Sequence, residues 1–116
     1  MIVSPDTRSS VLRPAAPDGT PGPHIEHLLD AALLGASGRL FARVTLAPGA
    51  AIAPHPHHGE FEIYALLTGE GDYNDNGTIR PVRAADVTFC PDGEFHGLKN
   101  TGSAPLELIA FIGHDK

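Results

Sequence analysis

The chain is poor in the features that mark several large classes of protein. Its 116 residues include a single cysteine, Cys90, so no disulfide can form within one chain. Nothing in the cysteine content therefore implies an oxidising compartment. Lys and Arg number 8 against 14 Asp and Glu, and the formal net charge is -6. Because nucleic-acid binding depends largely on basic surface, no nucleic-acid partner is expected.

Long apolar segments are missing as well. The N-terminus lacks the charged-then-apolar pattern of a signal peptide, and no apolar run approaches the length of a membrane span. No membrane partner is therefore expected, and a cytoplasmic location is predicted. Tryptophan is absent, whereas 13 glycines and 11 prolines are present. That balance favours short strands joined by tight turns over a helical bundle.

The first 23 residues are rich in proline. Five of the 11 prolines fall there, which excludes a regular helix. A few apolar side chains lie between them: Ile2, Val3, Val11 and Leu12. The segment is therefore either a disordered leader or an arm that packs on the domain or on a partner subunit. We predict a Pro-rich N-terminal arm over residues 1–23 and one folded domain over residues 24–116.

Strand signals run through the predicted domain. Residues 24–38 fit either a helix or a short strand that ends at Asp30 and is followed by one helical turn. From residue 39, "RLFARVTL" alternates between two faces, and "EFEIYALLTG" and "APLELIAFIG" are apolar runs typical of strands. Asn76-Gly77 supplies the positive φ values of a tight hairpin turn. Roughly seven or eight short strands predict an all-β fold, an antiparallel sandwich or small barrel.

Three of the seven histidines stand together in "HPHHGEFE". On an extended strand the side chains of His55 and His57 leave the same face with Cα atoms about 7 Å apart, close enough to bind one ion. Unbroken alternation puts Glu62 on the opposite face, so a turn or bulge at His58-Gly59 is expected to switch the register. A carboxylate aimed into an apolar barrel is costly unless a cation or a donor meets it.

Two spaced motifs carry a family resemblance. Residues 49–69 fit G-x5-H-x-H-x4-E-x6-G, and residues 91–100 fit P-x-G-x2-H-x3-N. The matching residues are Gly49, His55, His57, Glu62, Gly69, Pro91, Gly93, His96 and Asn100. These are the two motifs of the cupin superfamily, which the chain resembles over residues 39–113. One departure is Ala85, where the second motif normally begins with glycine; the alanine is expected to cost about 1 kcal/mol or to select another turn.

The resemblance implies an antiparallel double-stranded β-helix, or jelly-roll barrel, that holds one divalent metal ion. The implied ligands are His55, His57, Glu62 and His96. Three nitrogens and one oxygen can take Fe, Mn, Ni, Co, Cu or Zn. Four protein ligands leave about two octahedral positions for water or substrate, which is typical of an open site and disfavours a purely structural metal.

Two neighbouring residues are candidates for further roles. Glu60 is predicted as a general base or as a hydrogen-bond partner of a ligand histidine, with a solvated carboxylate at the rim as the alternative. Tyr64 should share the face of Glu62, where it steers a substrate oxygen or packs in the core. Cys90 is expected to be a small buried hydrophobe.

The reaction cannot be chosen from fold and ligands, because cupins similar to this chain include dioxygenases, isomerases, decarboxylases, cyclases, lyases and binding proteins. The first hypothesis is a metalloenzyme acting on a small oxygenated molecule such as a keto acid, diketone, sugar acid or polyketide-like phenol. The alternative is a non-catalytic protein that binds a small molecule with the metal as anchor. Sheet edges need cover, so a homodimer is predicted, with the arm adding a strand to a neighbour.

Overall fold

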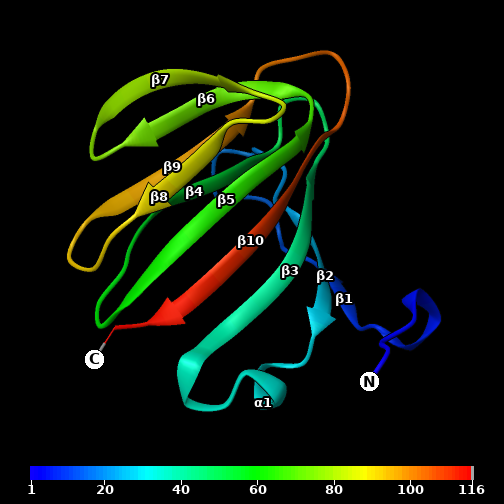
Figure 1. Cartoon of the computed structure of the whole chain (residues 1–116). Helices are drawn as coiled ribbons and strands as arrows, with labels where there is room; N and C mark the ends of the chain where they lie inside the picture. Colours follow the sequence, from blue (N-terminus) through cyan, green and yellow to red (C-terminus); the bar gives the residue numbers. More distant parts are fainter. Residues whose placement is uncertain (116) are drawn as a thin grey trace.

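The structure, a computed structural model, describes residues 1–115, so the last position of the predicted domain 24–116 lies outside the described residues. Its strands form two antiparallel sheets that face each other (Figure 1). One sheet has six strands in the order β1-β2-β3-β10-β5-β8, and the other has four in the order β4-β9-β6-β7. The all-β jelly-roll prediction is confirmed.

The strands are β1 (Ser10–Leu12), β2 (His24–Leu29), β3 (Gly38–Leu46), β4 (Ala51–Pro56), β5 (Glu60–Thr68), β6 (Glu70–Asp75), β7 (Thr78–Arg83), β8 (Val87–Cys90), β9 (Phe95–Asn100) and β10 (Leu106–His114). The described helices are short: α1 (Ala31–Leu34) and two 3-10 helices, Pro5–Thr7 and Gly35–Ser37. Residues 24–34 thus follow the second alternative, a strand and then one helical turn. Among the described residues, no helix is long and apolar enough to span a membrane.

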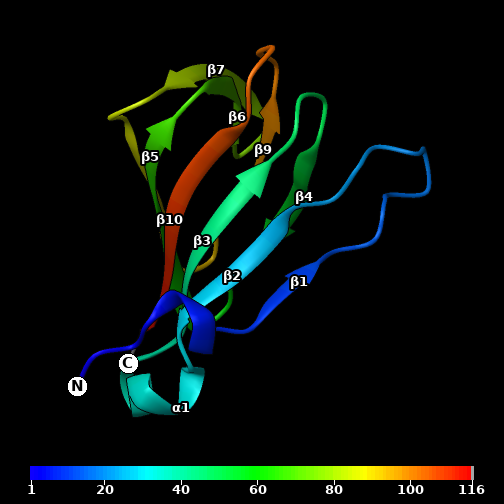
Figure 2. The same cartoon turned by 90° about the vertical axis from the view of Figure 1, so that its right-hand side faces the viewer.

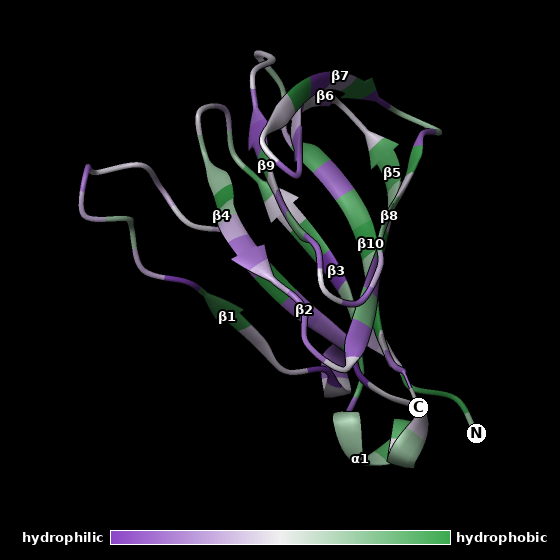
Figure 3. Ribbon diagram, turned by 90° about the vertical axis from the view of Figure 1, so that its left-hand side faces the viewer, coloured by the Kyte–Doolittle hydropathy of each residue, from purple (hydrophilic) through white to green (hydrophobic). Residues whose placement is uncertain are grey.

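The hydrophobic core fills the space between the two sheets. In strand β5, alternate residues face this core. Glu60, Glu62, Tyr64 and Leu66 are buried, and the residues between them are partly exposed. Apolar side chains from both sheets meet there: Val44, Leu46, Tyr64, Leu66, Tyr73, Leu98, Leu106 and Leu108. Strand β10, between β3 and β5, is largely apolar along its length (Figure 3). The two buried carboxylates therefore point into this apolar layer.

Two strands lie in proline-containing segments. Strand β4 contains Pro54 and Pro56, which cannot donate to a sheet ladder. It forms an edge of the four-stranded sheet and pairs with β9, with a register shift between Ile52 and His55. An edge strand tolerates proline because its other side needs no donors. The second such strand is β1, only three residues long, within the Pro-rich segment.

Two parts of the N-terminal segment contact the folded domain. Ser10 and Leu12 of β1 pair with Glu26 and His24 of β2 in the same chain. The loop that follows β1 swings away from its sheet and returns toward β4 (Figure 2). There the backbone N–H of Ala51 donates to the carbonyl of Pro21 at 3.0 Å. The arm therefore extends its own sheet and contacts the edge of the other.

Ala85 takes the place of a motif glycine and keeps the backbone conformation that glycine would favour. Its φ is 77°, in the left-handed region. Its N–H donates to the carbonyl of Leu66 at 2.9 Å, which connects the turn to β5. Of the two outcomes expected for Ala85, the structure shows the strained backbone.

Candidate metal centre

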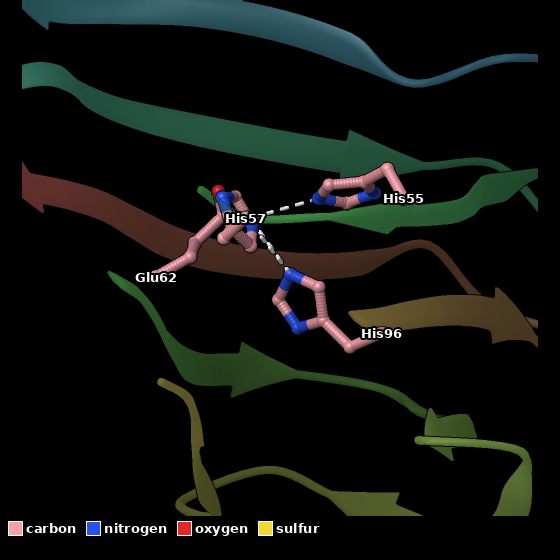
Figure 4. Close-up of side chains that lie close together, drawn as sticks. All are labelled: His55, His57, Glu62 and His96. Atoms are coloured by element: carbon pink, nitrogen blue, oxygen red, sulfur yellow. Dashed lines mark hydrogen bonds and ion pairs between the residues drawn. The ribbon is translucent and has the colours of Figure 1, made fainter. Parts of the chain in front are cut away.

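Three side chains from residues 55–62 and a fourth, His96, from a distant strand converge between the two sheets (Figure 4). His55 lies in β4 directly opposite His96 in β9. Glu62 lies in β5, and His57 follows the end of β4. One potential ligand atom from each residue lies within 4.8 Å of the others. The structure thus brings together all four residues that the motifs implied.

A tight turn at residues 57–59 makes this convergence possible. Gly59 adopts a φ of 73°, and its N–H donates to Oδ1 of Asp92 at 2.7 Å. The N–H of His57 donates to the carbonyl of Glu94, and the carbonyl of His57 accepts from the N–H of Gly93. The turn switches the alternation so that residues on both sides of it face inward. The predicted break at His58-Gly59 is present.

The carboxylate of Glu62 is the centre of the cluster. Its Oε1 lies 2.8 Å from Nε2 of His96, 3.0 Å from Nε2 of His57 and 3.1 Å from Nε2 of His55. His57 and His96 are 1% exposed and Glu62 4%, whereas His55 is partly exposed. Burial alone would raise the pKa of Glu62, but hydrogen bonds from His55 and His96 outweigh it and lower the pKa to about 2.

The Nδ1 atom of each imidazole also makes a hydrogen bond to a group outside the cluster. Nδ1 of His55 lies 2.8 Å from the carbonyl of Ala53, Nδ1 of His57 lies 2.7 Å from Oε1 of Glu60, and Nδ1 of His96 lies 2.7 Å from the hydroxyl of Tyr73. Metal-binding histidines typically have such partners, which fix the ring and its tautomer.

The arrangement fits a divalent cation. A carbonyl and a carboxylate only accept hydrogen bonds, so they select the Nδ1–H tautomer of His55 and His57. In this neutral tautomer the Nε2 lone pair faces Oε1 of Glu62, whereas a proton on Nε2 makes the same nitrogen a hydrogen-bond donor to that oxygen. Nε2 of His57 lies 3.2 Å from Nε2 of His96. Lone pairs gathered around an anionic oxygen repel one another unless a positive charge lies among them, and a divalent ion supplies that charge.

Glu60 does not lie at a solvated rim, because it is only 9% exposed. Its carboxylate accepts the Nδ1 contact of His57 and two hydrogen bonds from Arg39, at 2.7 Å and 2.8 Å. The Arg39 guanidinium is the main cause that lowers the pKa of Glu60 to about 2, with His57 adding to it. The contact with His57 matches the role of hydrogen-bond partner of a histidine in the cluster, one of the two roles considered for Glu60. Its role as a general base stays a prediction.

Tyr64 lies behind the cluster and is 1% exposed. Its ring stacks on that of His96 with centroids 4.7 Å apart and planes 15° from parallel. Burial raises the pKa of Tyr64 well above its usual value, so the phenol keeps its proton at neutral pH. Cys90 is buried as expected, and burial raises the pKa of its thiol to about 11, which argues against a thiolate ligand at this position.

Sequence reasoning missed two residues near the site, Arg39 and Tyr73. Alternation in β3 assigns Arg39 to the outer face with Phe41, yet its long side chain reaches Glu60. Alternation in β6 could have placed Tyr73 inward, since Gly71 and Tyr73 are its buried positions. No sequence signal indicated that the Tyr73 hydroxyl meets His96, because the partner is 23 residues away.

A cavity of about 320 Å³ borders the cluster, and its wall includes His55, His57, Glu62 and Tyr64. Larger cavities of about 400 Å³ and 440 Å³ lie elsewhere, and none of the four cluster residues lines them. The smaller cavity therefore gives a ligand access to three residues of the cluster, His55, His57 and Glu62.

Known proteins support this picture. A family model described as a cupin domain matches residues 42–112. An "Oxalate-binding protein" of Thermotoga maritima is 48% identical over 86 residues, which cover 74% of this chain and 71% of that protein. A Klebsiella pneumoniae mannose-1-phosphate guanylyltransferase is 33% identical over 78 residues, 63% of this chain but only 17% of that longer protein. The crystal structure of a "predicted oxalate decarboxylase" from T. maritima has a TM-score of 0.88 at 39% identity and covers 98% of this chain and 99% of its own.

Proposed function

The chain belongs to the cupin family, and from this premise we propose that it binds one divalent metal ion through His55, His57, Glu62 and His96 and uses that site to hold a small carboxylate. The observation that carries the proposal is the convergence of three Nε2 atoms on one buried carboxylate. The candidate ions are Fe, Mn, Ni, Co, Cu and Zn, which three nitrogens and one oxygen accommodate.

Charge favours an anionic ligand. A bound divalent ion would act as a Lewis acid toward ligand oxygens, and its charge exceeds that of its one carboxylate partner. Around it, the chain's own side chains hold the imidazoles in place: Glu60 orients His57, and Tyr73 orients His96. The Thermotoga maritima relative is named for oxalate binding. Oxalate is therefore the first ligand to test.

Binding without catalysis is favoured by the state of the nearby carboxylates. The pKa values of Glu60 and Glu62 are both lowered to about 2, so neither carries a proton to donate at neutral pH. Glu60 is also engaged by Arg39 and His57, which leaves it poorly placed as a general base. Apolar side chains, rather than proton-transfer groups, make up most of the remaining cavity wall.

The second candidate function is a metalloenzyme that converts such a ligand, a keto acid or dicarboxylate being the first choice among small oxygenated substrates. The likeness to the T. maritima "predicted oxalate decarboxylase", at 39% identity, supports it. Decarboxylation breaks a carbon–carbon bond and requires a proton for the new carbon–hydrogen bond. A water molecule would have to supply that proton, because both glutamates are ionised and burial raises the pKa of Tyr64.

Calorimetric titration of the metal-loaded protein with oxalate tests the proposal. We expect heat of binding that disappears after chelation and in a His57→Ala variant. Equal binding with and without metal would contradict it. Incubation with ¹³C-oxalate distinguishes the two functions, because an unchanged carbon spectrum supports binding and the appearance of formate and bicarbonate supports catalysis.

Two further inferences from the sequence belong to the proposal, a homodimer and a cytoplasmic location. The homodimer is supported by apolar side chains that the arm leaves exposed, among them Ile2 and Leu12. The cytoplasmic location is supported by the single, buried cysteine.

A further inference from the structure

The cavity beside the metal cluster has two chemically different parts. One end is formed by the polar side chains of His55, His57 and Glu62. Most of the remaining wall is formed by aliphatic side chains from four strands: Ile25 of β2, Leu40 and Val44 of β3, Ile52 of β4 and Ile112 of β10. Pro23, Ala53, Tyr64 and two arginines, Arg13 and Arg39, complete the lining. A site for a small, wholly polar molecule does not need such a wall.

The aliphatic wall is not simply the closed core of the barrel. Val44 and Ile112 are 3% and 5% exposed, but Ile25, Leu40 and Ile52 are only partly buried. These three pack against the core on one side and face the cavity on the other. An unfilled apolar surface of this kind gains free energy when an apolar group covers it.

The cavity is too large for a two-carbon diacid. Oxalate takes up roughly 90 Å³, about three times the share of one water molecule in the liquid. The cavity measures about 320 Å³. Oxalate with both carboxylates at the polar end would leave most of the aliphatic wall in contact with water.

We propose that the natural ligand is an organic acid with oxygens on two adjacent carbons at one end and an apolar body of about three to seven further carbons, such as a branched-chain or aryl 2-oxo or 2-hydroxy acid. The oxygen-bearing end faces the cluster, and the apolar body lies against Ile25, Leu40 and Ile52. This inference rests on the proposed binding of a carboxylate at the metal, and it names the class of that carboxylate.

Four acids test it by calorimetric titration of the metal-loaded chain: oxalate, pyruvate, 4-methyl-2-oxopentanoate and phenylpyruvate. The two oxo acids with an apolar body share the polar end of pyruvate, so any difference in Kd reports the aliphatic wall. Each buried methylene strengthens binding about fourfold. We expect 4-methyl-2-oxopentanoate to bind about 10- to 60-fold more tightly than pyruvate.

Matched variants test whether the tighter binding of the larger acids comes from the aliphatic wall of the cavity. Ile52→Thr and Ile25→Thr keep a β-branched side chain in the strand while reducing the apolar surface, and both positions are partly exposed, which favours folding. Each should remove most of the advantage of 4-methyl-2-oxopentanoate and leave the Kd of pyruvate nearly unchanged. The control is Ile79→Thr, an exposed residue of β7 that does not line this cavity and should change neither value.

The outcomes separate the inference from the function on which it rests. Metal-dependent binding of oxalate or pyruvate, with no gain for the two larger acids, overturns the inference and leaves the proposed function standing. If 4-methyl-2-oxopentanoate still binds much more tightly than pyruvate in both Ile25→Thr and Ile52→Thr, the inference is also overturned. Failure of all four acids to bind in a metal-dependent way overturns both.

Discussion

His57 and Glu60 are joined by a hydrogen bond of 2.7 Å between Nδ1 and Oε1. The imidazole therefore lies between two carboxylates, since its Nε2 lies 3.0 Å from Oε1 of Glu62. Arg39 in turn donates two hydrogen bonds to Glu60. A chain of hydrogen-bonded groups therefore runs from Glu62 through His57 and Glu60 to Arg39. This chain orients His57, the one histidine of the cluster that lies outside a strand.

Removal of the outer carboxylate should weaken metal binding. In Glu60→Ala, His57 loses its Nδ1 acceptor and Arg39 its partner, and we expect metal affinity to fall about 10- to 100-fold. Glu60→Gln keeps an acceptor oxygen and should lose less. Competition with a coloured chelator measures the affinity. The control is Glu107→Ala, which breaks the exposed ion pair with Arg43 on the outer surface and should leave the affinity unchanged.

Loss of a ligand histidine should have a larger effect than loss of its neighbour. His57→Ala should nearly abolish bound metal, because it removes one of four donors from a buried site. His58→Ala, one residue further along the chain but exposed, should retain the metal. Elemental analysis of both proteins, purified without an affinity tag, measures the bound metal. Equal metal content in the two variants would mean that His57 is not a ligand.

Metal affinity should fall in mildly acidic solution. Burial tends to lower the pKa of His55, but its hydrogen bonds to Glu62 and to the Ala53 carbonyl outweigh this and raise the pKa above 6.5. Protons therefore compete for His55 from near neutral pH downward, while burial lowers the pKa of His96 and delays its protonation. Affinity should be highest above pH 7 and fall by about tenfold per pH unit for each competing proton below that range. An affinity that is constant from pH 8 to pH 5 would contradict this ligand set.

The carboxylate of Glu60 should also make stability depend on pH at the acid end. Its pKa is lowered from 4.5 to about 2, so the folded state binds its proton less readily than the unfolded chain. The resulting stabilisation is complete above about pH 5 and is lost as the pH falls toward 2. Denaturant unfolding of the metal-free protein should show a difference between wild type and Glu60→Gln that shrinks over this window. A difference that grows toward pH 2 would have the wrong sign.

Ala85→Gly should stabilise the protein. Alanine at a φ of 77° is strained, and glycine adopts this conformation at no steric cost. We expect the free energy of unfolding to rise by about 1 kcal/mol, which corresponds to an increase in Tm of roughly 3–6 °C. Ala84→Gly provides the control, because Ala84 has no positive φ and glycine there should be slightly destabilising. Thermal melts of the three proteins measure the effect.

The sequence by itself determined the family, the layered β fold and the four residues of the cluster. It could do so because these properties are local or are encoded in fixed spacings: alternation in β5 directs Glu62 inward, Gly59 allows the turn, and the motif intervals place His55, His57 and His96. Ala85 was recognised as a departure from the motif for the same reason, and the structure decided between strain and another turn type.

Only the tertiary structure decided what surrounds the cluster. Strand β4 contains two prolines, and its place at the edge of a sheet makes them acceptable. The arm pairs with its own sheet because β2 offers it a free edge. The contacts of Arg39 with Glu60 and of Tyr73 with His96, and the aliphatic wall beside the metal, join side chains from separate strands. Such contacts depend on how far a side chain reaches across a folded sheet, and alternation along a single strand does not specify that distance.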